Sequence, residues 1–142
     1  VPVALMFFDG APRLLDAGVT IPGLQQGDPD RIVVEAYPGV LARNFIGRKS
    51  YKSDTPSKQT VQQLAARRDL LGSVTGNGII KDYGIEVEAP LYLADDPTGD
   101  RLDALLCAIQ AAWAWTRRNE GFGAPNPCDA TEGWIADSAV TI

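Results

Sequence analysis

One apolar run limits the folds open to this chain more than any other feature. Residues 31–37 read Arg-Ile-Val-Val-Glu-Ala-Tyr, with hydrophobic and β-branched side chains at successive positions. Such a run is typical of a strand buried on both faces, as in parallel or mixed sheets that helices cover. The sequence therefore predicts an α/β domain in which residues 31–37 form a central strand, ended by Pro38-Gly39.

Helices are predicted after this strand. The clearest spans residues 100–118, where an apolar stripe recurs at helical spacing and runs through Leu106 to Trp113. Trp115 lies off the stripe, and we expect a neighbouring segment to cover it. Shorter helices are expected over residues 40–46 and over residues 57–71, the second with Ser57 as N-cap and a stop at Gly72.

The start of the chain carries weaker signals. Residues 3–8 are apolar and predict a short buried strand or a helix end. Asp9-Gly10 is expected to form a turn, and residues 9–30 are rich in turn residues and are predicted to be mostly irregular.

Composition excludes several chemistries. The 142 residues include no histidine, which excludes Ser-His-Asp and Cys-His catalysis and histidine zinc sites. The two cysteines, Cys107 and Cys128, lie far apart without a CxxC motif, so we expect reduced thiols in a cytoplasmic protein. No apolar run approaches the roughly 20 residues of a membrane span, so no membrane partner is expected.

Positive charge is concentrated in one stretch of an acidic chain. The net charge is −5, yet residues 43–68, here named the basic segment, carry seven basic residues and one acidic residue. A local excess of cations on an acidic protein favours a phosphate-binding site. The alternative is a solvated loop followed by an ordinary charged helix face.

Glu35 is the first candidate site residue. A carboxylate beside an Ile-Val-Val run is costly to bury unless a cation, a metal or backbone donors satisfy it. Ligands of open α/β sheets bind at the carboxyl ends of strands, where Glu35 is expected to lie. The alternative is a salt bridge to Arg31 or Arg43.

Asp100 and Asp103 are the second group of candidates. They are three residues apart in the first turn of the predicted long helix, so they share a face. The alternative is that they only complement the helix dipole. With Glu35 they would form an all-oxygen ligand set suited to Mg²⁺ or Mn²⁺, and two such ions can promote phosphodiester cleavage.

Five segments in order resemble one protein family. They are VVEAYP at 33–38, GRKSYK at 47–52, RRDLL at 67–71, GDRLDALLCA at 99–108 and EGWI at 132–135. In this order the chain resembles the DUF429 family of predicted ribonuclease-H-like nucleases. The resemblance implies the C-terminal part of a ribonuclease-H-like fold, a mixed sheet flanked by helices.

The resemblance also implies roles for individual residues. Glu35 and Asp103 would be the active-site carboxylates, and Asp100 would be an auxiliary metal ligand. Lys52, preceded by Tyr51, and one of the two adjacent arginines would fall on the family's basic positions. The phosphate-binding candidates are therefore Arg48, Lys49, Tyr51, Lys52 and Arg68.

The resemblance fails at the start of the chain. The family begins with a strand that ends in an aspartate and a glycine, followed by two more strands. Asp9-Gly10 imitates that motif, but the residues between Asp9 and Glu35 are too few for two strands and a helix. We therefore expect residues 1–142 to be one domain that lacks the family's N-terminal strands, and to require that portion or a partner chain.

These observations predict an uncharacterised metal-dependent nuclease that hydrolyses phosphodiester bonds of nucleic acid. Residues 1–142 alone are expected to be inactive and to bind divalent metal weakly. The alternative is a non-catalytic ribonuclease-H-like domain that binds a nucleotide, a nucleic acid or a protein partner.

Overall fold

The computed structural model describes residues 3–129, 131 and 133–140, and this part of the chain is mostly helical with one small sheet. The predicted α/β class is confirmed at this coarse level. The elements, in chain order, are α1 (Val3–Asp16), β1 (Val19–Thr20), β2 (Asp28–Ile32), α2 (Pro38–Ile46), η1 (Pro56–Lys58), α3 (Val61–Val74), α4 (Asn77–Tyr83), η2 (Leu91–Asp95), α5 (Asp100–Thr116) and η3 (Arg118–Gly123).

The sheet is smaller than the apolar run predicts. β1 and β2 pair in parallel, and β2 ends at Ile32, so a central strand over residues 31–37 is wrong. Beyond β2 the backbone is extended, and the carbonyl of Glu35 accepts the N–H of Ala136 at 2.8 Å in a parallel bridge. A β-branched run forms a continuous strand only where neighbours pair with its backbone. In the part of the chain that the structure describes, the stretch beyond β2 has only two short backbone pairings: the N–H of Val33 donates to the carbonyl of Thr20 at 2.9 Å, and Glu35 forms the bridge to residues 135–136.

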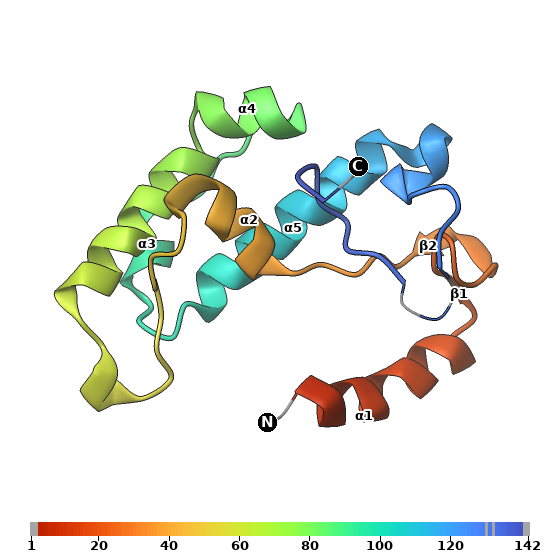
Figure 1. Cartoon of the computed structure of the whole chain (residues 1–142), viewed down its shortest axis with the longest axis horizontal. Coiled ribbons are helices and arrows are strands. Elements are labelled where there is room, and N and C mark those ends of the chain that lie inside the picture. The colour runs from red at the N-terminus through yellow and green to blue at the C-terminus, as the bar shows by residue number, and fades with distance from the viewer. Residues whose placement is uncertain (1–2, 130, 132, 141–142) are drawn as a thin grey trace.

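The core lies between the helices. α2 packs on α5 and α3, and α3 packs on α4 and η2, while α5 runs through the middle of the molecule (Figure 1). Aliphatic side chains fill the space between these helices and are almost fully buried: Leu41, Leu70, Leu71, Val74, Ile79, Leu102 and Leu106. Burying each of them contributes about 1.5–3 kcal/mol to folding.

Two predicted helices are found close to their expected places, and one is shifted. α5 covers Asp100–Thr116, and α2 covers Pro38–Ile46 and ends at Gly47, as expected. α3 begins later than the expected cap at Ser57, because Thr60 and Gln63 form a reciprocal capping box. It continues through Gly72 to Val74, since packing outweighs the roughly 1 kcal/mol that a helical glycine costs.

For residues 3–8 the structure favours the helix over the buried strand, and it contradicts the expected turn at Asp9-Gly10. Residues 3–16 form α1, so Asp9 is helical and pairs with Arg13 at 3.3 Å instead of lying in a turn. Phe8 is 79% exposed, so the run is not a buried strand. Trp115 is also exposed and contacts Phe122 and Arg118, so its expected cover is missing in the described residues. Within those residues, no helix has the length and hydropathy that crossing a bilayer requires.

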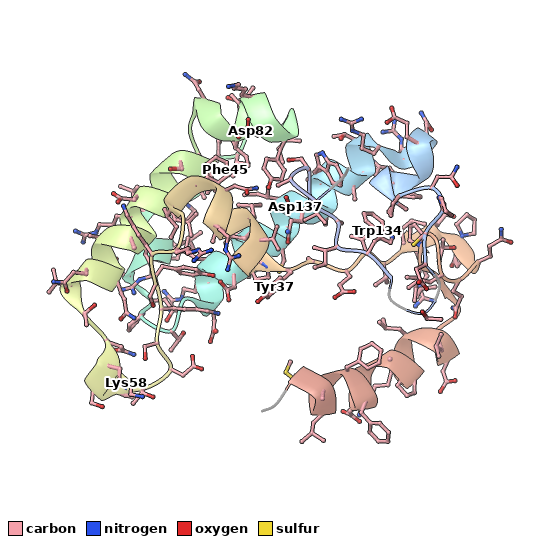
Figure 2. The ribbon with its side chains drawn as sticks, viewed as in Figure 1. Tyr37, Phe45, Lys58, Asp82, Trp134 and Asp137 are labelled. Carbon is pink, nitrogen blue, oxygen red and sulfur yellow. The ribbon has the colours of Figure 1, made fainter. Side chains whose placement is uncertain are left out.

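A buried polar network joins the last segment to the helices. Asp137 is fully buried and accepts hydrogen bonds from the Tyr83 hydroxyl at 2.8 Å and from the Gln110 amide at 2.6 Å. Figure 2 shows Asp137 beside α5, with Trp134 earlier in the same segment. Trp134 donates to the carbonyl of Pro22 at 2.9 Å and so fixes the segment near the sheet. Glu132, which opens the EGWI segment, lies outside the described residues.

Candidate functional site

Asp103 lies in the first turn of α5, and the preceding loop sets its position. Gly99 is the N-cap, and the carboxylate of Asp96 accepts the N–H of Arg101 at 3.1 Å. Asp96 also accepts the Thr98 hydroxyl at 2.7 Å, and this hydrogen bond is the main reason that the pKa of Asp96 is lowered. The side chain of Asp96 therefore accepts from a backbone N–H of the first turn of α5, although Gly99 holds the N-cap position.

The side chain of Asp103 meets the basic segment. The Tyr51 hydroxyl donates to Oδ1 of Asp103 at 2.6 Å, and the Lys52 ammonium pairs with Oδ2. The Asp103 side chain is 18% exposed and that of Lys52 is 40% exposed, so the pair lies at the edge of the core. Residues some fifty positions apart in sequence thus form one polar site, and three of the predicted site residues belong to it.

A glycine permits this close approach. Gly99 has a φ of 78°, and a Cβ added there would lie 2.8 Å from the Cβ of Lys52. A side chain at position 99 would therefore both strain the backbone and displace Lys52 from Asp103. The glycine in the GDRLDALLCA segment thus has a steric reason to be there.

Electrostatics stabilise the protonated forms of Tyr51 and Lys52. Burial raises the pKa of Tyr51, and the hydrogen bond to Asp103 raises it further. Burial lowers the pKa of Lys52, but the hydrogen bond and the charge of Asp103 outweigh it, so the net change is upward. Cys107, a free thiol one turn after Asp103, has a raised pKa because of burial and then the charge of Asp103.

Arg67 supports the site from its buried side. Its side chain is 3% exposed, and it donates to the carbonyl of Ala94 at 2.7 Å and to the carbonyl of Tyr51 at 2.9 Å. Burial lowers the pKa of Arg67, while the charges of Asp96 and Asp95 oppose this. Arg67 therefore joins the Tyr51-Lys52 stretch to η2, which leads into the cap of α5.

The sequence analysis selected the neighbouring Arg68, not Arg67, as a phosphate-binding candidate. Arg68 is exposed and lies 3.9 Å from Asp95, at a distance from which a surface pair contributes little. The helical spacing of Arg67 with Leu70, Leu71 and Val74 places it on the buried face of α3. That spacing is the signal that could have identified Arg67.

The predicted phosphate-binding residues separate into two groups. Arg48, Lys49 and Tyr51 line one cavity of about 340 Å³, together with Arg43, which the sequence did not single out for phosphate binding. We name it the arginine cavity. Lys52 instead pairs with Asp103, and Arg68 is not among the residues that line the arginine cavity. Tyr51 connects the two groups, because it lines the cavity and donates to Asp103.

The predicted carboxylates are not assembled into one metal site. Glu35 is exposed and lines a different cavity, of about 520 Å³, beside Trp134 and Val34. Among the described residues it forms no ion pair with Arg43 or with Arg31, which instead donates to the carbonyl of Ala17 at 3.0 Å. Across residues 3–129, 131 and 133–140, no three His, Cys, Asp or Glu side chains are grouped closely enough to hold a metal ion.

Comparison with known proteins gives no relative. No family model matches this chain, and neither does any curated protein or solved structure. Its function is therefore argued from the residues and their arrangement.

The buried tyrosines give a test of the site by titration. We expect Tyr51 and Tyr83 to ionise only as the chain unfolds, because a tyrosine in an unfolded chain ionises near pH 10. Burial raises both pKa values in the folded state. The unfolded chain therefore releases these protons first, and stability falls as the pH rises above 10.

Absorbance at 295 nm against pH, with tryptophan fluorescence as the unfolding signal, measures this on the 142-residue chain. The part of the absorbance change that belongs to Tyr51 and Tyr83 should appear only together with unfolding. If the whole tyrosine absorbance change appeared while the chain was still folded, the contacts of Tyr51 and Tyr83 would be contradicted.

Proposed function

We propose that the protein hydrolyses phosphodiester bonds of nucleic acid and that Asp103 is a carboxylate of the reacting site. The observation that carries this proposal is the contact of Asp103 with Tyr51 and Lys52. It joins a half-buried acid to the basic segment, so that phosphate-binding and proton-accepting groups occur together. An enzyme that cleaves a phosphodiester needs both kinds of group near the same phosphorus.

The finer fold is part of this proposal. The segments listed above resemble the DUF429 family, which implies a ribonuclease-H-like fold. The parallel bridge between Glu35 and Ile135 supports it, because the two segments are joined by a long helical connection. Parallel neighbours need such a crossover, which is the unit from which α/β sheets are built.

In the proposed reaction Lys52 binds the phosphate and Asp103 acts on the attacking water. Without substrate, the ammonium of Lys52 neutralises Asp103. A phosphate that approaches Lys52 competes for the ammonium by charge-assisted hydrogen bonds. Asp103 then keeps the Tyr51 hydrogen bond and gains a free oxygen that can orient or deprotonate an attacking water.

The residues present do not fit a complete metal site. Both carboxylate oxygens of Asp103 are engaged, and Glu35 lines another cavity. Asp100 and Asp103 supply oxygen donors of the right type, but six ligands are usual for Mg²⁺. Mg²⁺ or Mn²⁺ is proposed as the ion of the reaction on the basis of the resemblance, with further ligands required beyond these two aspartates.

Metal binding gives a prediction from this geometry. The 142-residue chain is expected to bind Mn²⁺ weakly, and Lys52→Met is expected to raise the affinity about tenfold, because it removes a competing cation from Asp103. Electron paramagnetic resonance of free Mn²⁺ measures this, with Lys58→Met as the matched control for an exposed lysine. Equal affinities in Lys52→Met and Lys58→Met would show that Lys52 does not block the aspartates.

A second function is supported by one observation. Because Lys52 and Tyr51 occupy both oxygens of Asp103, the same contacts could serve only to hold the basic segment on α5. The protein would then be a non-catalytic domain that binds nucleic acid, a nucleotide or a partner.

A cleavage assay decides between the two functions. The full-length protein is incubated with end-labelled single- and double-stranded DNA and RNA, in Mg²⁺, in Mn²⁺ and in EDTA. We expect cleavage in at least one divalent metal, none in EDTA, and a loss in Lys52→Met that Lys58→Met does not share. Strand binding without cleavage under any of these conditions would contradict catalysis and favour the binding domain.

A further inference from the structure

The arginine cavity lies beside the Asp103 site but is separate from it. It is a hollow of about 340 Å³ between the C-terminal half of α2 and the loop that follows, lined by Arg43, Arg48, Lys49 and Tyr51. That volume is at the small end of the range for ligand pockets, so it accommodates a phosphate and its sugar but not a long strand. Its lining includes no carboxylate.

The cations of this cavity are largely unpaired. Among the described residues, Arg43 and Arg48 have no carboxylate within ion-pair distance. Lys49 lies 3.6 Å from Asp69, and both side chains are about 60% exposed, so their pairing contributes little. Three positive charges therefore face one hollow without a buried counter-ion.

The negative charge near the arginine cavity is too small to cancel the positive charge of Arg43, Arg48 and Lys49. The cavity lies at the carbonyl end of α2, where the helix dipole contributes about half a negative charge. Gly39 and Gly47 also line the hollow, and a Cβ at Gly47 would meet no atom within 4 Å, so the backbone leaves room for a ligand. The net field favours an anion of charge near −2.

We propose that the arginine cavity binds the terminal phosphate monoester of a nucleic acid strand. A monoester carries −1.5 to −2 charges and three terminal oxygens at neutral pH, whereas an internal diester carries one charge and two such oxygens. Two guanidinium groups and an ammonium match the monoester in charge and in hydrogen-bond donors. Tyr51 forms part of the cavity wall and also contacts Asp103, so a strand held by its end presents a nearby phosphodiester to Asp103.

This inference rests on the proposed function only in taking the ligand to be a nucleic acid. It narrows the substrate to strands that bear a terminal phosphate, cut close to that end. The side chains of Arg43 and Arg48 are exposed. The N–H of Gly47 donates to the backbone carbonyl of Arg43, so this hydrogen bond does not involve the Arg43 side chain. Substituting either arginine should therefore leave the fold intact.

The test is a binding competition in EDTA at low salt, so that cleavage plays no part. Unlabelled strands of one sequence, with a 5′-phosphate, with a 3′-phosphate or with hydroxyls at both ends, compete against a labelled strand followed by anisotropy. We expect one phosphorylated strand to compete at least about tenfold better than the hydroxyl strand, the gain typical of a charge-assisted contact. Which of the two strands competes better identifies the end that is bound.

Three arginine variants test whether the preference for phosphorylated strands comes from the arginine cavity. Arg43→Gln and Arg48→Gln should each abolish most of the advantage of the phosphate, and Arg13→Gln on α1 should keep it. Equal competition by all three strands, or an advantage that survives both variants, would overturn the inference. The competition is measured without metal, so its outcome does not depend on cleavage. A protein that prefers phosphorylated ends but cleaves no strand would refute the nuclease proposal and support the phosphate site. A nuclease that binds all three strands equally would support the nuclease proposal and refute the phosphate site.

Discussion

Replacing Arg67 with methionine is expected to lower the free energy of unfolding by about 3 kcal/mol, because two buried carbonyl groups lose their donor and each costs about 1–3 kcal/mol. The carbonyls are those of Tyr51 and Ala94, and the Arg67 side chain is 3% exposed, so water has little access to replace it. Methionine fills most of the same volume, which limits the contribution of a cavity.

Urea unfolding followed by tryptophan fluorescence measures this effect, and the next residue provides the control. Arg68→Met removes an exposed guanidinium 3.9 Å from Asp95 and should change stability by less than about 0.5 kcal/mol. If Arg67→Met unfolds at the same urea concentration as Arg68→Met, the two buried hydrogen bonds do not stabilise the site.

Asp103→Asn is expected to lower cleavage of nucleic acid by at least about a hundredfold, the usual effect of removing a general base or a charge from a reacting site. Asparagine has nearly the same shape and keeps an oxygen that can accept the Tyr51 hydrogen bond. The half-buried ion pair with Lys52 loses its charge, which should cost at most about 1 kcal/mol of stability. Activity should thus be lost from a folded protein.

The helices α2 and α5 could be predicted because their signals are local, whereas α4 (Asn77–Tyr83) was not predicted. The apolar stripe of α5 and the Pro-Gly start and glycine end of α2 each determine a helix within one short window. The strand over residues 31–37 could not be predicted correctly, because strand formation depends on which neighbours pair with it. α1 was predicted only in part, because its exposed apolar residues look like a buried run.

Part of the candidate site was also within reach of the sequence. The resemblance named Tyr51, Lys52 and Asp103, and the structure brings these three together, although their chemical roles stay predictions. Arg67 was missed because charge alone suggests a surface position, whereas its spacing places it in the core. Glu35 was expected beside Asp103, but it lines another cavity, and one sequence holds no signal for that separation.

The most direct test compares two aspartates in one assay. Single-turnover cleavage of a labelled strand is measured for the full-length protein, for Asp103→Asn and for Asp82→Asn, with unfolding curves for all three. Asp82 lies exposed on α4, as Figure 2 shows, and supplies the same loss of charge away from the site. We predict at least a hundredfold slower cleavage for Asp103→Asn alone, and equal rates for the two variants, in folded proteins, would contradict a reacting role for Asp103.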